Sequence, residues 1–295
     1  MKPFGGPSLH TALAATLALA LGACAPYRVV DVPSTNQSSR VAYVVLHFTS
    51  ESFGESLRLL TQPSDYPVSS HYLIPESGDP TYPRSRPMLY RLVPEHRRAW
   101  HAGVSDWAGA DSLNDRSIGI ELVNRSACTR EDPAALHLPP LADTCRFLPY
   151  DPAQLDLLVT LLRDLLARYP DIEPVNIVAH SDIAPQRKVD PGPLFPWRRL
   201  AELGIGAWYD DDAVARHRAQ LAERQPSTAA LQAALKAYGY ETDTDGVMDK
   251  AAQRVVRAFQ LHFTPDNVTG QFDLETVAVL FALIEKYRPD ELAAA

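Results

Sequence analysis

Positive charge, cysteine and long apolar runs are all scarce in this 295-residue chain. The formal net charge is −8 and the isoelectric point is about 5.6, so there is no electrostatic footprint for nucleic acid or anionic lipid. The three cysteines lie outside any nucleophilic Cys/His signature. An almost unbroken apolar run, residues 11–21, is too short to span a bilayer with ease. We therefore expect neither nucleic-acid binding nor thiol catalysis.

Two catalytic signatures are also missing. There is no helical H-E-x-x-H pair, so a metal site would need ligands from distant segments. There is no G-x-S-x-G elbow, which disfavours a serine hydrolase. The chain is nevertheless long enough for one to three domains and a sizeable core.

The N-terminal segment has the layout of a signal peptide: Lys2, then the apolar run, then residues 21–24 (LGAC). The LGAC segment resembles the bacterial lipoprotein box, which implies that residues 1–23 are a removed signal peptide and that Cys24 is acylated. Two or more acyl chains anchor a protein stably. An ordinary secretory signal with an incidental cysteine is the alternative.

Residues 24–39 are polar and show no periodicity, as expected of a lipidated tether. Ala25 stands where an aspartate usually retains such proteins in the inner membrane. The pattern therefore predicts a protein that is lipid-anchored in the outer membrane, on its periplasmic face.

Two apolar segments end in His47 and His180, and each predicts a buried strand that delivers an imidazole to the edge of a sheet. Residues two apart in extended backbone face the same side, and the proline after Asp190 biases that residue away from helix. Lys188 and Asp190 can therefore point into one cavity beside His180. A catalytic zinc takes three protein ligands and a water, and His47 is the best donor to complete the set.

Six ordered segments resemble zinc-dependent N-acetylmuramoyl-L-alanine amidases, a superfamily that includes animal peptidoglycan recognition proteins. They are residues 45–49 (VLHFT), 70–74 (SHYLI), 99–103 (AWHAG), 114–121 (NDRSIGIE), 179–182 (AHSD) and 188–192 (KVDPG). Residues 182–197 are most similar to the lipoprotein amidases of Gram-negative outer membranes. The resemblance implies an α/β catalytic domain over residues 40–209, with a central mixed β-sheet flanked by helices.

The resemblance also implies one Zn²⁺ per chain, held by His47, His180 and Asp190. Glu121 matches the glutamate that accepts a proton from the metal-bound water. It lies in an otherwise apolar strand, where an unpaired carboxylate is costly, and a structural ion pair is the alternative. Lys188 would stabilise the anion that forms when the amide is attacked. The alternative for Lys188 is a surface lysine, which would be the default interpretation if Asp190 were not close by in the sequence.

Four further residues are predicted to contact substrate or to lie beside the site: His71, His101, Trp107 and Asn114. Among them, His101 is expected to line the groove together with Trp100 or Trp107. Asp182 is expected to be an N-cap or loop residue. The remaining histidines beyond the signal segment have no partner pattern and are expected to be solvated: His96, His137, His217 and His262.

Strand and helix patterns alternate before residue 209. Residues 70–74, 88–93 and 118–123 are strand candidates, and residues 52–60 suggest a helix. The clearest helix begins at Asp151, with a proline in its first helical position, and ends at a Tyr-Pro pair. Its leucines repeat at helical spacing, which indicates core packing.

Cys128 and Cys145 bracket a proline-containing insert, residues 129–144. Because the chain is expected to enter an oxidising compartment, we predict a disulfide between them. It would stabilise the fold by roughly 3 kcal/mol. Two free thiols without a catalytic role are the alternative.

The pattern changes after residue 209. Residues 210–226 predict a helical linker, and residues 227–290 predict three short helices with one apolar face each. These faces need one another, so they indicate a small three-helix domain. Residues 231–260 are similar to the peptidoglycan-binding three-helix module; the alternative is an element that only stabilises the catalytic domain.

The predicted activity is hydrolysis of the amide between N-acetylmuramic acid and L-alanine, in peptidoglycan or in muropeptides with an intact or a 1,6-anhydro sugar. The protein is expected to act as a monomer. The alternative from another class is a wall-recognition protein that keeps the groove but does no chemistry.

Overall fold

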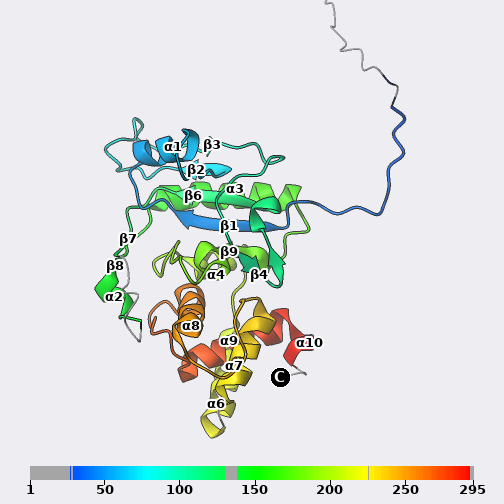
Figure 1. Ribbon diagram of the computed structural model, residues 1–295, viewed down its shortest axis with the longest axis vertical. Coiled ribbons are helices and arrows are strands. Elements are labelled where there is room, and N and C mark those ends of the chain that lie inside the picture. The colour runs from blue at the N-terminus through cyan, green and yellow to red at the C-terminus, as the bar shows by residue number, and fades with distance from the viewer. Residues whose placement is uncertain (1–26, 28, 130–137, 225, 293–295) are drawn as a thin grey trace, which may run out of the picture. The chain divides into compact units, whose positions relative to one another are not determined.

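The computed structural model describes residue 27 and residues 29–129, 138–224 and 226–292 (Figure 1). Among the described residues, those up to residue 37 are separate from the compact unit that begins at residue 38. Cys24 and His137 lie outside the described residues. None of the helices in the described ranges is long and apolar enough to cross a membrane.

Five strands form the central sheet, in the order β3-β2-β6-β1-β9. They are β1 (Tyr43–Phe48), β2 (Tyr72–Ile74), β3 (Tyr90–Arg91), β6 (Ser117–Leu122) and β9 (Ile177–Ala179). Strand β1 is parallel to β6 and β9, β2 is parallel to β6, and β3 pairs with β2 in antiparallel fashion. The predicted mixed sheet is confirmed, and its four parallel strands present their carboxyl ends at one edge.

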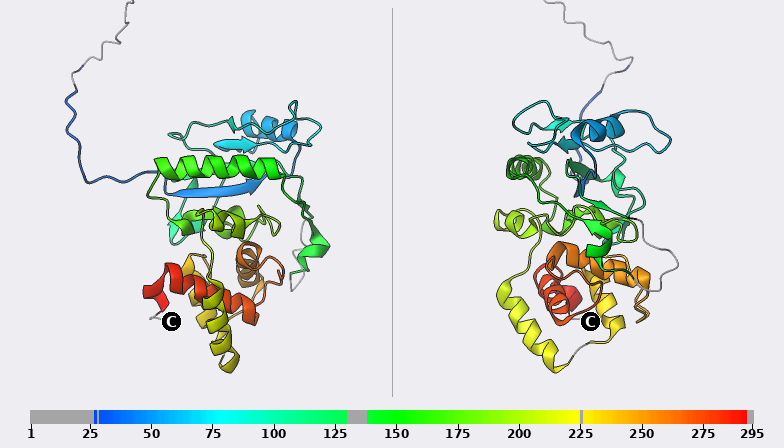
Figure 2. Two further views of the ribbon diagram at one scale, coloured as in Figure 1. Left: turned by 180° about the vertical axis from the view of Figure 1, so that it is seen from behind. Right: turned by 90° about the vertical axis from the view of Figure 1, so that its left-hand side faces the viewer.

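Helix α3 (Pro152–Arg168) covers one face of the sheet (Figure 2). Its N-terminus is capped by Asp151, whose carboxylate accepts a hydrogen bond from the backbone of Ala153. The buried leucines of α3 share one core with Val44 and Leu46 of β1. Burial of each such side chain contributes about 1.5–3 kcal/mol, so this face fixes which side of β1 points toward α3.

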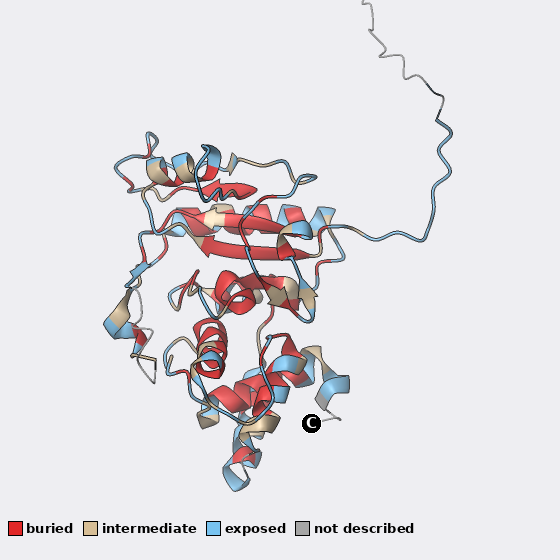
Figure 3. Cartoon of the chain, in the orientation of Figure 1, coloured by how far each residue is buried: buried red, intermediate tan, exposed pale blue. Residues whose placement is uncertain are grey.

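The opposite face of the sheet meets the C-terminal helices. Tyr43, Val45 and Val178 share an apolar core with residues of α7 (Thr228–Tyr238) and α8 (Lys250–Phe263). The short helix α4 (His180–Ile183), which directly follows β9, packs against α8. Figure 3 shows that burial continues from the strands through α4 into α8, so the sheet and the C-terminal helices share one core.

The C-terminal helices begin at polar capping residues. Ser227, Asp249 and Asp273 each accept a hydrogen bond from a backbone N–H in the first turn of α7, α8 and α9 (Leu274–Tyr287), respectively. The three predicted helices of this region are confirmed. A further helix, α6 (Asp211–Glu223), occupies the predicted linker.

The remaining elements are short. They are α1 (Phe53–Thr61), β4 (Asp106–Trp107), β5 (Ala110–Asp111), η1 (Leu113–Asp115), β7 (Ala127–Cys128), α2 (Leu141–Thr144), β8 (Cys145–Arg146), η2 (Pro174–Asn176), α5 (Trp197–Glu202) and α10 (Pro289–Leu292).

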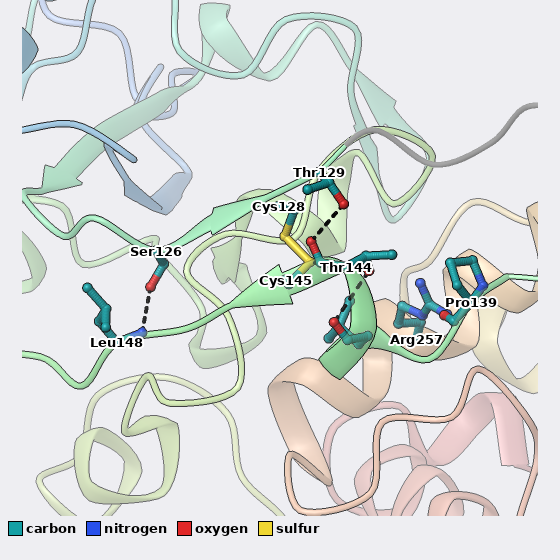
Figure 4. The surroundings of a disulfide bond; sticks show 9 residues. Ser126, Cys128, Thr129, Pro139, Thr144, Cys145, Leu148 and Arg257 are labelled. Carbon is teal, nitrogen blue, oxygen red and sulfur yellow. Dashed lines mark hydrogen bonds between the residues drawn. A yellow bond between two sulfur atoms is a disulfide. The ribbon is translucent and has the colours of Figure 1, made fainter.

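A disulfide joins Cys128 to Cys145 across the hairpin of β7 and β8 (Figure 4). The hairpin is continued by the backbone hydrogen bond from Thr129 to Thr144, at 2.7 Å. The insert between the two strands is therefore closed at its base by a covalent bond as well as by strand pairing.

Candidate metal centre and active-site pocket

Three polar side chains lie at the carboxyl edge of the sheet because parallel strands deliver them there. His47 is near the end of β1 and pairs in register with Glu121 of β6. His180 directly follows β9, on the other side of β1. The order of the strands thus brings together two histidines that are 133 residues apart in sequence.

His47, His180 and Asp190 converge on one point. The Nδ1 atoms of the two histidines are 2.9 Å apart, and each lies 3.1 Å from Oδ2 of Asp190. The three residues are 1%, 3% and 5% exposed, so little water reaches them. Among the described residues they form a group of ligand atoms close enough together to hold one metal ion.

The tautomer of His180 follows from the hydrogen bond of Nε2, the outer ring nitrogen that does not face the other two residues. Its Nε2 lies 3.2 Å from the carbonyl oxygen of Ala102, which can only accept a hydrogen bond. The proton of the neutral ring is therefore on Nε2, and the lone pair of Nδ1 is directed at the metal position.

The tautomer of His47 follows from a longer chain of hydrogen bonds. The hydroxyl of Ser117 donates to the carbonyl of Leu113 at 2.5 Å, so it accepts from Nε2 of His101 at 3.1 Å. Nδ1 of His101 then accepts from Nε2 of His47 at 3.0 Å. The lone pair of Nδ1 in His47 is therefore free as well.

Two imidazole lone pairs and one carboxylate oxygen thus face one another with no hydrogen between them. Burial and the neighbouring His180 lower the pKa of His47 to about 4, and burial lowers the pKa of His180. The nearby imidazoles hold the pKa of Asp190 well below its usual range, against the effect of burial. Such a group needs a cation, and two nitrogen ligands with one carboxylate fit zinc better than magnesium or calcium, which prefer oxygen.

A single loop supports both histidines. His101 and Ala102 are adjacent in residues 99–103, and together they accept the outer N–H groups of His47 and His180. The loop is fixed in turn by Asn114, whose Oδ1 accepts from the backbone N–H of His101 at 3.0 Å and of Ala102 at 2.8 Å. Outer partners of this kind set the orientation of metal ligands.

The close packing of this loop requires a glycine in β6. A Cβ atom added to Gly119 would lie 2.4 Å from the ring of His101. Arg187 holds the other end of the loop, because its guanidinium donates to the carbonyl oxygens of Ala102 and Val104.

Glu121 lies beside the metal position and lines the same pocket as the three ligands and Lys188. Its Oε2 is buried and has no hydrogen-bond partner among the described residues. Burial, reinforced by the charge of Asp190, raises the pKa of Glu121 to about 8, while Lys188 opposes the rise. A carboxyl group with this pKa can accept or donate a proton near neutral pH.

The pocket is a cavity of about 200 Å³ above the carboxyl edge of the sheet. Its polar lining includes the three ligand residues, Glu121 and Lys188, and its apolar lining includes Leu59, Leu60 and Val68. Trp100 also lines it and is 48% exposed, so its ring is available to an incoming molecule.

The residues predicted to contact substrate lie in different places. Only His101 lines the pocket, and it is 8% exposed beneath His47. His71 is fully buried, and its Nδ1 accepts from the backbone N–H of Gly119. Asn114 acts on the loop backbone, as described above.

Trp107 was expected in the groove, and this expectation is wrong. The ring is 1% exposed, its Nε1 donates to the carbonyl of Val175 at 3.0 Å, and it packs on Tyr238 and Tyr240 of the C-terminal region. An exposed ring on a loop and a buried ring at a contact between segments give the same sequence pattern, because the partner residues are more than 130 positions away.

His262 was expected to be solvated, and this expectation is also wrong. It is 3% exposed, and its Nδ1 lies 2.7 Å from Oδ2 of Asp182. His96 is exposed, as expected, whereas His217 is only partly exposed and lies 2.7 Å from a carboxylate oxygen of Glu285.

Sequence reasoning missed Ser117, Ala102 and Arg187, which orient the site from outside. Ser117 is the first residue of the otherwise apolar strand that carries Glu121, and a serine at such a position carries no signal of its own. Ala102 acts through its carbonyl, which no residue type reports. The available clue was the adjacency of His101 to a small residue and glycine in one short loop.

Comparison with known proteins agrees with the family that the sequence motifs resemble. Residues 37–193 match the family described as N-acetylmuramoyl-L-alanine amidase, and residues 224–280 match a putative peptidoglycan binding domain. The chain is 46% identical over 252 residues to N-acetylmuramoyl-L-alanine amidase AmiD of Escherichia coli, covering 85% of each chain.

Two solved structures are similar over most of their length. AmpDh3 from Pseudomonas aeruginosa in complex with an anhydromuramic pentapeptide has a TM-score of 0.76 and 43% identity, over 89% of this chain and 96% of that one. E. coli AmiD in complex with anhydro-N-acetylmuramic acid-L-Ala-D-γ-Glu-L-Lys has a TM-score of 0.73 and 44% identity, over 87% and 93%.

Proposed function

The chain belongs to the N-acetylmuramoyl-L-alanine amidase family, and from this we propose that it cuts the amide between N-acetylmuramic acid and L-alanine in peptidoglycan and its fragments. Its relatives are solved with anhydromuropeptides, so fragments with a 1,6-anhydro sugar are included among the proposed substrates. The observation that carries the proposal is the convergence of His47, His180 and Asp190 beside Glu121.

We propose that the three converging residues hold one Zn²⁺. When bound, zinc would polarise the scissile carbonyl and make a coordinated water more acidic. His47 and His180 contribute neutral Nδ1 ligands because their outer N–H groups are fixed by His101 and Ala102. Asp190 contributes the single negative charge, which leaves the centre net positive toward a developing anion.

Glu121 supplies the proton chemistry. Its unpartnered Oε2 accepts the proton of the attacking water and later returns it to the departing L-alanine nitrogen. Lys188 lines the same pocket, and its positive charge favours the negative oxygen that forms when the carbonyl is attacked. The apolar residues that line the pocket lower the local polarity and so strengthen both interactions.

The test is Glu121→Gln. We expect this variant to keep its zinc affinity, measured by chelator competition, and to lose roughly 10²–10⁴-fold in kcat on a defined muropeptide. Glu76→Gln is the matched control, because burial also raises the pKa of Glu76 but the residue does not line the pocket. Wild-type turnover by Glu121→Gln would contradict the assignment. A wild-type protein that binds muropeptides without cleaving them would instead be a recognition protein.

We further propose that the mature protein is an outer-membrane lipoprotein acylated at Cys24. The LGAC box at residues 21–24 supports this, and residues 29–37 are exposed and without regular secondary structure, as a tether should be. Replacing Cys24 with serine should move the protein from the membrane fraction to the soluble fraction. An unchanged distribution would exclude the lipid anchor.

The C-terminal helices are proposed to contact peptidoglycan, since residues 224–280 match a putative peptidoglycan binding domain. We propose the boundaries 40–209 for the catalytic domain, 210–226 for the linker and 227–290 for the helical domain. Sedimentation of the full chain with purified cell walls, in the presence of excess soluble muropeptide that occupies the catalytic pocket, tests this role. Binding to the walls that persists would support it, and binding that is lost would contradict it.

A further inference from the structure

A buried carboxylate lies where α4 of the catalytic domain meets the C-terminal helices. Asp182 is 0% exposed and stands two residues after His180. Its Oδ2 accepts from the backbone N–H of Ala179 at 2.8 Å and from Nδ1 of His262 at 2.7 Å, and its Oδ1 accepts from the hydroxyl of Tyr240 at 2.7 Å. Two of its three donors therefore come from the C-terminal helical region.

Both donors are held rigidly. The ring of His262 is stacked between Trp197, with centroids 3.8 Å apart, and Phe263, at 3.9 Å. Tyr240 is fully buried, and its ring meets Trp107 edge-on at 4.9 Å. Because neither ring can turn without disrupting this packing, the positions of their donors determine the position of the carboxylate.

The segment that Asp182 anchors carries much of the metal centre. His180 is the first residue of α4. The carboxylate of Asp182 accepts from the backbone N–H of Ala179, the residue that directly precedes this helix. The backbone N–H of Ser181 donates to the carbonyl of Asp190 at 2.9 Å. Two of the three metal ligands are thus attached to a four-residue turn whose own fixed point is the side chain of Asp182.

We propose that Tyr240 and His262 are positioning residues for the metal centre, acting through Asp182 and α4. The inference rests on the proposed zinc function. It assigns the C-terminal helices a role that binding to the wall does not require: they hold His180 and Asp190 in place, even when the substrate is a small soluble muropeptide. A domain that only docks would stabilise the fold but leave the affinity for zinc unchanged.

The energetic reason is that a buried carboxylate is costly when its donors are removed. If one donor is lost while the surrounding structure stays packed, Asp182 must turn toward another donor or toward water. Either movement displaces the turn that carries His180. Deleting the whole helical region would instead expose Asp182 to water, so single substitutions are the sharper probe.

The test compares two substitutions of His262 that separate the hydrogen bond from the packing. His262→Asn keeps an N–H donor near the position of Nδ1 but loses the stacked ring, whereas His262→Phe keeps the ring and loses the donor. We expect His262→Phe to lower zinc affinity roughly 10-fold, to lower kcat on a soluble muropeptide and to leave KM unchanged. His262→Asn should retain affinity within about 2-fold of wild type.

Tyr240→Phe provides a second line, with the same losses expected. Tyr238→Phe is its control, because the ring of Tyr238 also packs on Trp107 but makes no hydrogen bond to Asp182 in the described part of the chain. The melting temperature of each metal-free variant shows whether the variant folds. Affinity is compared only between variants that melt cooperatively; if none of the donor-lacking variants does, Tyr240→Phe is repeated in the presence of a stabilising osmolyte.

The opposite order, with His262→Asn weakened and His262→Phe unchanged in zinc affinity, would overturn the proposal in favour of packing alone. The proposal would also be overturned if His262→Asn, His262→Phe and Tyr240→Phe all lowered the melting temperature but left zinc affinity unchanged. The C-terminal helices would then have a docking role only. A wild-type protein that fails to bind zinc or to cleave muropeptides would overturn the proposed function itself.

Discussion

Beyond the loop that holds both rings, the two imidazoles of the metal centre are supported from different parts of the molecule, although both present Nδ1 to the same point. His47 is supported from within the sheet: its outer nitrogen reaches His101, then Ser117, then a backbone carbonyl, all within residues 101–117. His180 lies at the start of the short helix α4. The carboxylate of Asp182 in this helix accepts hydrogen bonds from Tyr240 and His262, which lie 58 and 80 positions further along the chain.

The difference shows how one site can depend on two levels of folding. The support of His47 exists once the sheet and one loop have formed. The support of His180 is complete only when the C-terminal helices pack on the catalytic domain. The following predictions, from the largest effect on the site to the smallest, test whether the two histidines can be perturbed separately.

The largest effect should follow from removing either ligand. His47→Ala and His180→Ala each leave two protein ligands, so zinc affinity should fall by more than the roughly 10- to 100-fold expected for the loss of an outer partner, and turnover should be lost. The two variants should be equivalent, whatever the difference in their support. Zinc content after dialysis and hydrolysis of a defined muropeptide measure both effects, and retained turnover in either variant would rule out the ligand set.

The next effect concerns the shared loop. Asn114→Ala removes the acceptor that fixes the backbone of both His101 and Ala102, so it should weaken the support of both histidines and cost roughly 10- to 100-fold in zinc affinity. Ser117→Ala removes only the last link beneath His47 and should cost less, roughly 10-fold. Chelator competition measures both.

Ser126→Ala is the control for Ser117, because Ser126 is equally buried and hydrogen-bonded but lies away from the pocket.

The double variant tests whether the supports of the two histidines are independent. If they are, the losses of zinc-binding free energy in Ser117→Ala and Tyr240→Phe should add within about 0.5 kcal/mol. A larger deviation would mean that one network, and not two, holds the site.

A smaller effect concerns pH and the metal-free protein. The pKa of Glu121 is raised by burial from an ordinary value of 4.5 to about 8. Proton binding by Glu121 therefore stabilises the folded state fully below pH 4.5, and this contribution is lost as the pH rises through 8. Glu121→Gln stays neutral, so its free energy of unfolding relative to wild type should increase between pH 5 and pH 9.

Urea unfolding in the presence of a chelator, at several pH values, measures this difference. If the difference in free energy of unfolding between wild type and Glu121→Gln does not change with pH, the pKa of Glu121 is not raised in the folded state. Excess zinc should shift the loss of stability to lower pH, because a nearby cation favours the ionised carboxylate.

The smallest effect on the site should come from the disulfide. Cys128→Ser with Cys145→Ser removes a cross-link that stabilises the fold by roughly 3 kcal/mol, so the melting temperature should fall. In the part of the β7–β8 hairpin that the structure describes, no residue supports either histidine, so zinc affinity and kcat should change less than about 2-fold. A large loss of zinc affinity would show that the hairpin is a third support of the centre.

The sequence by itself predicted the grouping of His47, His180 and Asp190, the strand that carries Glu121, the mixed sheet and the three C-terminal helices. The apolar runs ending in histidine, the leucine spacing of α3 and the short segments around Glu121 and Asp190 are local patterns, and local patterns record which face of a strand or helix is buried. The two cysteines likewise bracket a recognisable insert.

Only the tertiary structure decided what surrounds those residues. Trp107 and His262 looked like a groove residue and a surface residue, yet both are buried at contacts with segments far away in the chain. The tautomer of His47 is set through His101 by the hydroxyl of Ser117, and that of His180 by a backbone carbonyl, groups that carry no pattern in sequence. Burial and hydrogen bonding depend on which surfaces meet, and that is fixed by packing between distant segments and not by the residues of any one segment.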